Sequence, residues 1–159
     1  MNRKRILVVD DEIGFTRLLK LTLEQTNAYE VRVENWPERA LTAAREFRPD
    51  LILLDMVMPR MFGPEVAEGL RADTALEATP IVFFTAAVTK TSLKRSDGVI
   101  NGFLFLAKPS SLEEVVERIE QRLAGAAPAN RSALSDNRVA LSPEALTGNL
   151  RRDRAFAPA

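Results

Sequence analysis

The sequence predicts an α/β fold in which a mostly parallel sheet of five strands carries helices on both faces. Short apolar runs alternate along the chain with segments whose apolar residues recur at helical spacing, and this alternation is typical of strand and helix units joined in series. Four of the five runs are apolar at every position, as expected of strands buried on both faces of a parallel sheet. Right-handed crossovers between such strands favour the strand order 2-1-3-4-5.

The first part of the chain holds two strand and helix units. Ile6–Val9 is the first expected strand, and the helix after it has apolar residues at Phe15, Leu18, Leu19 and Leu23. Val31–Val33 alternates as a second strand would. Asn35 is then placed to cap a helix that runs to about Phe47, with an apolar face made by Ala40, Leu41, Ala44 and Phe47.

Three further units follow. The third strand is Leu51–Leu54, and Gly63-Pro64 breaks the loop after it, so the next helix is expected to begin near Pro64. Ile81–Phe84 is the fourth strand, and the crossover pattern requires a helix over about 89–100, where periodicity is weak. Phe103–Leu106 is the fifth strand. Ser110 or Ser111 caps the last helix, whose buried stripe is Leu112, Val115, Val116, Ile119 and Leu123.

The composition separates one domain, residues 1–126, from a linker and C-terminal extension, residues 127–159. The residues after Leu123 are rich in Ala, Ser, Asn and Gly and lack periodicity, although Ser142–Leu146 has the cap, proline and acid of a short helix. From Pro128 onward the chain has five Arg and three acidic residues. The extension is too short for a helix-turn-helix output domain.

Charge and residue usage exclude several classes of function. The 22 basic and 22 acidic residues balance, so no overall basic field attracts nucleic acid or membrane surfaces, and direct DNA binding is not expected. The chain has no Cys and no His, which removes thiol chemistry, the usual zinc ligands and an internal histidine phosphodonor. Neither a signal-peptide core nor a membrane-spanning run is present in the sequence. A cytoplasmic location is expected.

The polar residues that follow the strands are expected to meet at one edge of the sheet, since parallel strands end together. The set comprises Asp10, Asp11 and Glu12 after the first strand, Asp55 after the third, Thr85 after the fourth and Lys108 after the fifth. Crowded carboxylates repel one another unless a cation compensates them. Carboxylate and carbonyl oxygens with water suit Mg²⁺, so the sequence predicts a magnesium site.

Beside such a cation, Asp55 is a candidate nucleophile toward phosphorus, because carboxylates form aspartyl phosphates. Phosphoryl transfer depends mainly on positioning and on neutralising the spreading negative charge. The Lys108 ammonium and the Thr85 hydroxyl are the groups expected to bind the remaining phosphoryl oxygens.

Four motifs in order then resemble the receiver domain of two-component response regulators: "VVDDE", "LLDMVMPRMFG", "FFTA" and "LAKP". The resemblance covers about residues 3–124 and implies a flavodoxin-like fold. It also implies that Asp55 accepts a phosphoryl group from a sensor histidine kinase or a histidine phosphotransfer protein. In that reading Mg²⁺ is held by Asp10, Asp11, Asp55 and the Val57 carbonyl. Thr85 and Lys108 bind the phosphoryl group, and the peptide bond before Pro109 is cis.

The resemblance further implies a switch in which Thr85 moves toward the phosphoryl group and Phe105 turns inward behind it. This changes the face made by the expected helix over 89–100, the strand at 103–106 and the last helix, which would bind a downstream protein or a second copy of the chain. Phe62 stands where the family usually has Asp, and is expected at the surface. Val57 and Ala87 flank the phosphoryl site and cannot hydrogen-bond an attacking water, which predicts a long-lived phosphorylated state.

Two alternatives remain open at this point. A degenerate receiver would bind proteins without phosphorylation, but the complete set of Asp11, Asp55, Thr85 and Lys108 argues against it. A haloacid-dehalogenase-like phosphatase would carry its nucleophile in a DxD motif after the first strand, whereas Asp10 and Asp11 are adjacent. We therefore expect a receiver that catalyses only its own phosphorylation and dephosphorylation, and no turnover of other substrates.

Overall fold

A parallel sheet is the centre of the fold in the computed structural model, which describes residues 2–94, 96–100 and 102–125. The strand order is β2-β1-β3-β4-β6-β5. Five strands are parallel, namely β1 (Lys4–Val9), β2 (Tyr29–Glu34), β3 (Leu51–Leu54), β4 (Ile81–Thr85) and β6 (Phe103–Ala107). β5 (Val99–Ile100) is an additional short edge strand, antiparallel to β6. The predicted α/β class and the order of the five parallel strands are confirmed.

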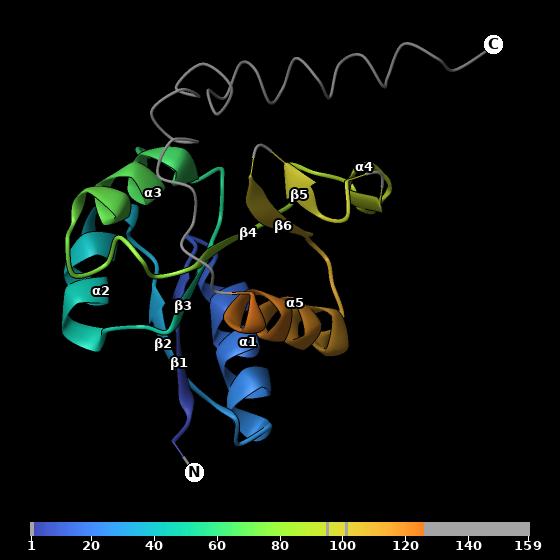
Figure 1. Cartoon of the computed structure of the whole chain (residues 1–159), viewed down its shortest axis with the longest axis horizontal. Coiled ribbons are helices and arrows are strands. Elements are labelled where there is room, and N and C mark those ends of the chain that lie inside the picture. Colours follow the sequence, from blue (N-terminus) through green and yellow to red (C-terminus); the bar gives the residue numbers. More distant parts are fainter. Residues whose placement is uncertain (1, 95, 101, 126–159) are drawn as a thin grey trace.

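Helices cover both faces of this sheet (Figure 1). The helices α1 (Ile13–Gln25) and α5 (Leu112–Ala124) lie side by side on one face. The other face carries α2 (Ala40–Phe47), which follows a single 3-10 turn (η1, Pro37–Arg39), and α3 (Gly63–Ala72). A short helix, α4 (Lys90–Lys94), lies beside β6. Each face of the sheet therefore has its own hydrophobic cluster.

The central strand β3 is apolar at every position because both of its faces are buried. Its four residues are each no more than 1% exposed. Ile52 and Leu54 point into the cluster under α2 and α3, while Leu51 and Leu53 point into the cluster under α1 and α5. A strand with no solvent-facing side has no position for a polar residue, so the first polar residue, Asp55, comes where the strand ends.

The segment over residues 89–100 differs from the expected helix. α4 ends at Lys94, and Val99 and Ile100 form β5, which pairs with Leu104 and Phe103 of β6. The prediction of one helix over this segment is wrong, because an Asn-Gly pair joins the two apolar runs and this pair favours a tight hairpin. Gly102 has φ +79°, a conformation that glycine adopts without strain.

The structure also settles two details of the helices. Leu18 is 66% exposed, and the buried residues of α1 are Thr16, Leu19 and Leu23. The four apolar residues at helical spacing are therefore not all buried, and Leu18 lies at the surface. Ser111 rather than Ser110 caps α5, since its hydroxyl accepts a hydrogen bond from the Glu114 amide at 3.2 Å. The predicted extension over 127–159, with its short helix, lies outside the described residues.

Asn35 does not cap a helix. Its side-chain amide donates to the Asp10 carbonyl at 2.7 Å and to the Thr16 hydroxyl at 2.9 Å, while η1 begins at Pro37 without a side-chain cap. The Asp10 amide donates to the Glu34 carbonyl at 3.1 Å. The Asp10 amide and carbonyl are therefore both held by hydrogen bonds, to the last residue of β2 and to the residue after it.

We predict that Asn35→Ala lowers the free energy of unfolding by about 1–2 kcal/mol, because two buried acceptors lose their donor. Both acceptors belong to residues that are no more than 2% exposed. Urea denaturation followed by circular dichroism would measure the change, and an unchanged midpoint would show that these hydrogen bonds contribute little.

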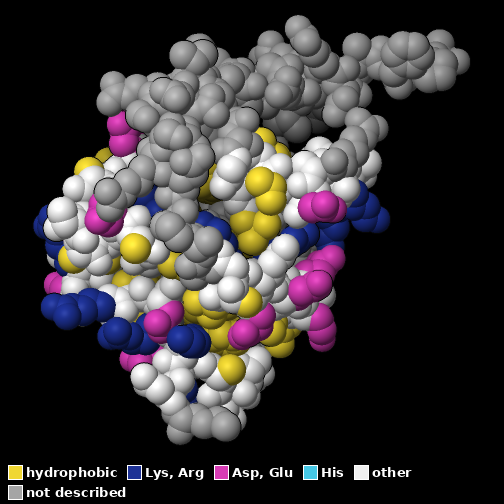
Figure 2. Space-filling model, viewed as in Figure 1, with side chains coloured by type: hydrophobic (Ala, Val, Ile, Leu, Met, Phe, Trp, Pro, Cys, Tyr) yellow, Lys and Arg dark blue, Asp and Glu magenta, His cyan; other side chains and the backbone are white. Residues whose placement is uncertain are grey.

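On the face shown in Figure 2, charged side chains of both signs lie among apolar side chains. This mixture agrees with the zero net charge of the sequence. Among the residues that the structure describes, we find no helix with the length and apolar character needed to cross a bilayer.

Candidate functional site

Four of the parallel strands bring their carboxyl ends to one edge of the sheet, and the predicted site residues lie at these ends. The Asp55 amide donates to the Val9 carbonyl at 2.9 Å, which places the end of β3 beside the end of β1. The Lys108 amide donates to the Thr85 carbonyl at 2.9 Å, which joins the ends of β6 and β4 in the same way. The sheet hydrogen bonds therefore fix the backbone of these residues.

Three carboxylates meet at this edge. Asp10, Asp11 and Asp55 can each offer an oxygen such that all three oxygens lie within 4.8 Å of one another. Asp10 and Asp55 are buried, while Asp11 is exposed to solvent. Burial raises the pKa of Asp10, and the charge of Asp55 acts in the same direction, although hydrogen bonding to Lys108 opposes both. The set has the oxygen donors and the excess negative charge that suit a hard divalent cation such as Mg²⁺.

Lys108 brings a positive charge into the carboxylate cluster. Its ammonium contacts the Asp10 carboxylate and lies 3.6 Å from Asp55 Oδ2. The side chain is only 11% exposed. The same ammonium lies over the ring of Phe15, 4.3 Å from the ring centroid. Lys108 therefore reaches the carboxylate that was predicted to accept the phosphoryl group.

Thr85 and the Asp55 carboxylate each use one oxygen locally. The Thr85 side chain is buried, and its hydroxyl oxygen accepts a hydrogen bond from the Ala87 amide at 3.2 Å. Asp55 Oδ1 accepts from the Met56 amide at 2.8 Å. The other oxygen, Asp55 Oδ2, faces the Lys108 ammonium.

The remaining predicted residues surround this edge. Val57 is 57% exposed in the loop after Asp55, and Phe62, 38% exposed, is at the surface as expected. The peptide bond between Lys108 and Pro109 is cis. Phe105 is fully buried and stacks on Phe83, with ring centroids 5.0 Å apart. The ring expected to turn inward on phosphorylation is thus already inside.

The sequence reasoning missed the role of Gly63. A Cβ atom at this position would lie 2.2 Å from the Asp55 carbonyl oxygen and 2.8 Å from the Met56 Cα. The Gly63 amide donates to the Met56 carbonyl at 2.8 Å. The first residue of α3 therefore packs directly on the backbone of the Asp55 loop, whereas the Gly-Pro pair alone indicated only a break in the loop.

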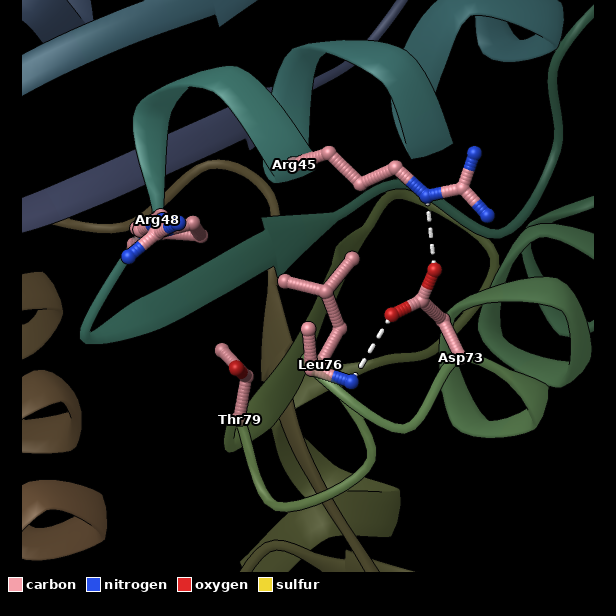
Figure 3. Close-up of a pocket in the computed structure, with 7 residues that line it drawn as sticks. Arg45, Arg48, Asp73, Leu76 and Thr79 are labelled. Atoms are coloured by element: carbon pink, nitrogen blue, oxygen red, sulfur yellow. Dashed lines mark hydrogen bonds and ion pairs between the residues drawn. The ribbon is translucent and has the colours of Figure 1, made fainter.

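A cavity of about 420 Å³ lies at the opposite edge of the sheet, where β3 and β4 begin (Figure 3). Its lining is Arg45, Arg48, Pro49, Asp73, Ala75, Leu76 and Thr79. Arg45 Nε lies 2.6 Å from Asp73 Oδ2, and this contact lowers the pKa of Asp73. None of the predicted phosphoryl or metal residues lines the cavity, so it is separate from the site at Asp55.

Comparison with known proteins agrees with the four motifs. The family model of the response regulator receiver domain matches residues 6–120. The DNA-binding response regulator MtrA of Mycobacterium tuberculosis is 37% identical over 123 residues, which are 76% of this chain and 51% of MtrA.

Solved structures show the same fold. The chemotaxis protein CheY4 of Vibrio cholerae is 28% identical, with a TM-score of 0.64 over 76% of this chain and 99% of CheY4. The receiver domain of the sensor histidine kinase PA1611 from Pseudomonas aeruginosa has a TM-score of 0.64 over 77% of this chain and 99% of that domain. It holds a magnesium ion in its active site cleft, and at 23% identity its likeness shows the fold alone.

One expectation about partners is corrected by these relatives. The sequence indicated no direct DNA binding, yet MtrA is a DNA-binding response regulator. This chain spans about half the length of MtrA. The balanced charge and the missing helix-turn-helix pattern describe only the 159 residues of this chain, so they were not a sound reason to exclude DNA binding.

The fold, the acidic edge with its lysine, and the matched family model lead to one conclusion. The chain belongs to the response regulator receiver domain family and is a signalling domain of the two-component type rather than a turnover enzyme.

Proposed function

We propose that Asp55 accepts a phosphoryl group from a histidine kinase or a histidine phosphotransfer protein, and that this reaction switches the chain between two signalling states. The observation that carries the proposal is the position of Asp55 at the sheet edge, with Asp10 and Asp11 beside it and the Lys108 ammonium 3.6 Å away. Because none of the 159 residues is His, the phosphodonor lies outside this sequence, either as a donor histidine or as a small phosphodonor.

In the proposed reaction an Asp55 carboxylate oxygen attacks phosphorus, and the bond between phosphorus and the donor atom breaks with its electron pair staying on the donor. Lys108 then pairs with a phosphoryl oxygen, and the Thr85 hydroxyl, freed from the Ala87 amide, donates to a second. Both contacts act where negative charge spreads during the transfer. The Lys108 and Asp55 side chains are largely buried, and contacts between charged groups are stronger where solvent screening is weak.

Asp10, Asp11, Asp55 and the Val57 carbonyl are the groups that we propose to hold Mg²⁺. When bound, the ion would neutralise phosphoryl oxygens and the excess carboxylate charge. The three clustered carboxylates and the raised pKa of Asp10 support this assignment.

We place the switch at Thr85 and Phe105. The two residues lie on the neighbouring strands β4 and β6, where Thr85 pairs with Ala107 and Phe105 pairs with Phe83. Movement of Thr85 toward a phosphoryl group would shift the end of β4 and repack Phe105 against Phe83. Because Phe105 has no hydroxyl and is already buried, it would act through packing alone.

Incubation with acetyl phosphate and Mg²⁺, followed by intact mass measurement, tests the proposal. We expect the mass of one phosphoryl group to be added, and we expect EDTA to prevent it. Absence of the adduct under both conditions would favour the degenerate receiver, which binds proteins without phosphorylation. Turnover of a phosphate ester would instead revive the phosphatase alternative, and none is expected from a member of the receiver family.

We predict that the phosphorylated form is long-lived for this family. Val57 is exposed beside Asp55, and neither its side chain nor that of Ala87 can hydrogen-bond an attacking water. Loss of the phosphoryl group, followed by intact mass after removal of the donor, should take much longer than seconds. Val57→Asn should shorten the lifetime roughly fivefold, the effect of one added hydrogen bond.

Val99→Asn is the matched control for this prediction. Val99 is also an exposed valine, 44% accessible, but it lies on the edge strand β5. Its substitution should leave the lifetime unchanged. Complete loss of the phosphoryl group from the unmodified chain within seconds would rule the prediction out.

A further inference from the structure

We infer that Phe15, supported by Phe84, is a positioning residue that holds the Lys108 ammonium beside Asp55 through a cation–π contact. The inference rests on the proposed function, because it concerns how Lys108 is presented to the phosphoryl group. The Lys108 ammonium lies 4.3 Å from the centroid of the Phe15 ring and 5.9 Å from that of Phe84. Both distances are within the range at which an aromatic face attracts a cation.

The two rings form one unit. Phe15 and Phe84 meet edge to face, with centroids 5.3 Å apart and an interplanar angle of 64°. Phe84 is on β4 and is only 3% exposed, while Phe15 is half-buried on α1 and packs against the same core cluster. The edge contact therefore fixes the Phe15 ring relative to the sheet that carries Lys108 and Asp55.

The Phe15 ring attracts the Lys108 ammonium without using up one of its hydrogen-bond donors, as a third carboxylate would. Asp10 already contacts the ammonium, and Asp55 lies 3.6 Å from it. A lysine ammonium has three donors, and a further carboxylate would bind one of them strongly and neutralise the charge needed for the phosphoryl oxygens. An aromatic face attracts the cation without accepting its proton, so a donor remains free to turn toward a phosphoryl group on Asp55.

Burial makes this contact effective. The Lys108 side chain is 11% exposed, and a cation–π contact is stronger where water is excluded. The lysine side chain has four rotatable carbon–carbon bonds, so without a contact on the side away from the carboxylates it would adopt several rotamers. The contact with the Phe15 ring reduces the number of rotamers that Lys108 can adopt. It keeps the ammonium 3.6 Å from Asp55 Oδ2.

Graded fluorination of Phe15 is the sharpest test, since fluorine weakens the negative face of the ring while nearly preserving its shape. The readout is the rate constant of phosphorylation by acetyl phosphate at saturating Mg²⁺, with its maximal value and the acetyl phosphate concentration that gives half of that value determined separately. We expect the maximal rate constant to fall steadily as fluorine atoms are added, without a matching loss of thermal stability. Phe15→Leu should lower the rate roughly 3- to 10-fold, and Phe15→Tyr, which keeps the aromatic face, should stay close to the unmodified chain.

Phe47→Leu is the matched control. Phe47 is also a partly buried phenylalanine under a cation, with Arg5 5.9 Å from its ring centroid, but it lies at the end of α2. Its substitution should leave the rate unchanged. Equal rates across the fluorinated series would overturn the inference while leaving the proposed function intact, even if Phe15→Leu failed to fold. Absence of phosphorylation in the unmodified chain would instead overturn the proposed function, and this inference with it.

Discussion

Asp55→Asn is expected to abolish phosphorylation by acetyl phosphate. The amide has almost the shape of the carboxylate but is not a nucleophile toward phosphorus. The substitution also removes one negative charge from a cluster whose oxygens lie within 4.8 Å of one another, so it should not destabilise the fold. Intact mass should show no phosphoryl adduct, while the melting temperature stays equal to or above that of the unmodified chain.

Asp97→Asn is the control for this substitution. Asp97 is exposed and has φ +50°, a conformation that Asn also adopts readily. This variant should be phosphorylated at the unmodified rate. An adduct of equal yield on Asp55→Asn would mean that another residue is the acceptor, and the role given to Asp55 would then be wrong.

Gly63→Ala is expected to lower the free energy of unfolding by about 3 kcal/mol. The added Cβ would lie 2.2 Å from the Asp55 carbonyl oxygen and 2.8 Å from the Met56 Cα, and backbone atoms cannot move aside as the end of a flexible side chain can. Either α3 or the Asp55 loop has to shift, and overpacking of this kind costs one to several kcal/mol. Urea denaturation would measure the loss. Because the same loop carries Asp55, the phosphorylation rate should fall as well.

Gly69→Ala gives the opposite expectation within the same helix. A Cβ at Gly69 would have no neighbour within 4 Å, and alanine in a helix interior is more stable than glycine by roughly 0.5–1 kcal/mol. This variant should be slightly stabilised. If Gly63→Ala and Gly69→Ala changed stability equally, the close packing of α3 on the Asp55 loop would not be the cause.

The sequence was sufficient for the parallel strands and the edge where they end. An apolar run such as Leu51–Leu54 has to be buried on both sides, and strands of this kind end at one edge of a parallel sheet. The polar residues after them, Asp10, Asp55 and Lys108, were therefore expected to meet, and the structure brings them together. These features depend on local patterns that are visible along the chain.

The features that were missed depend on contacts between distant segments. Phe15 was recognised only as part of an apolar stripe, since its contact with Lys108 joins α1 to the end of β6. Asn35 was expected to cap a helix, a position that Asn favours. Its side-chain amide instead donates to the Asp10 carbonyl, just after β1. The edge strand β5 is different, because the Asn-Gly pair before Phe103 was a local hairpin signal that could have been used.

The most direct test of whether Asp55 carries the phosphoryl group is to identify the phosphorylated residue chemically. Borohydride reduces an aspartyl phosphate to homoserine, a residue that peptide mass spectrometry distinguishes from aspartate. After treatment with acetyl phosphate and Mg²⁺, and then with borohydride, we expect homoserine at position 55 and unchanged aspartate at positions 10 and 11. Homoserine at either of those positions, or at none of the three, would contradict the account.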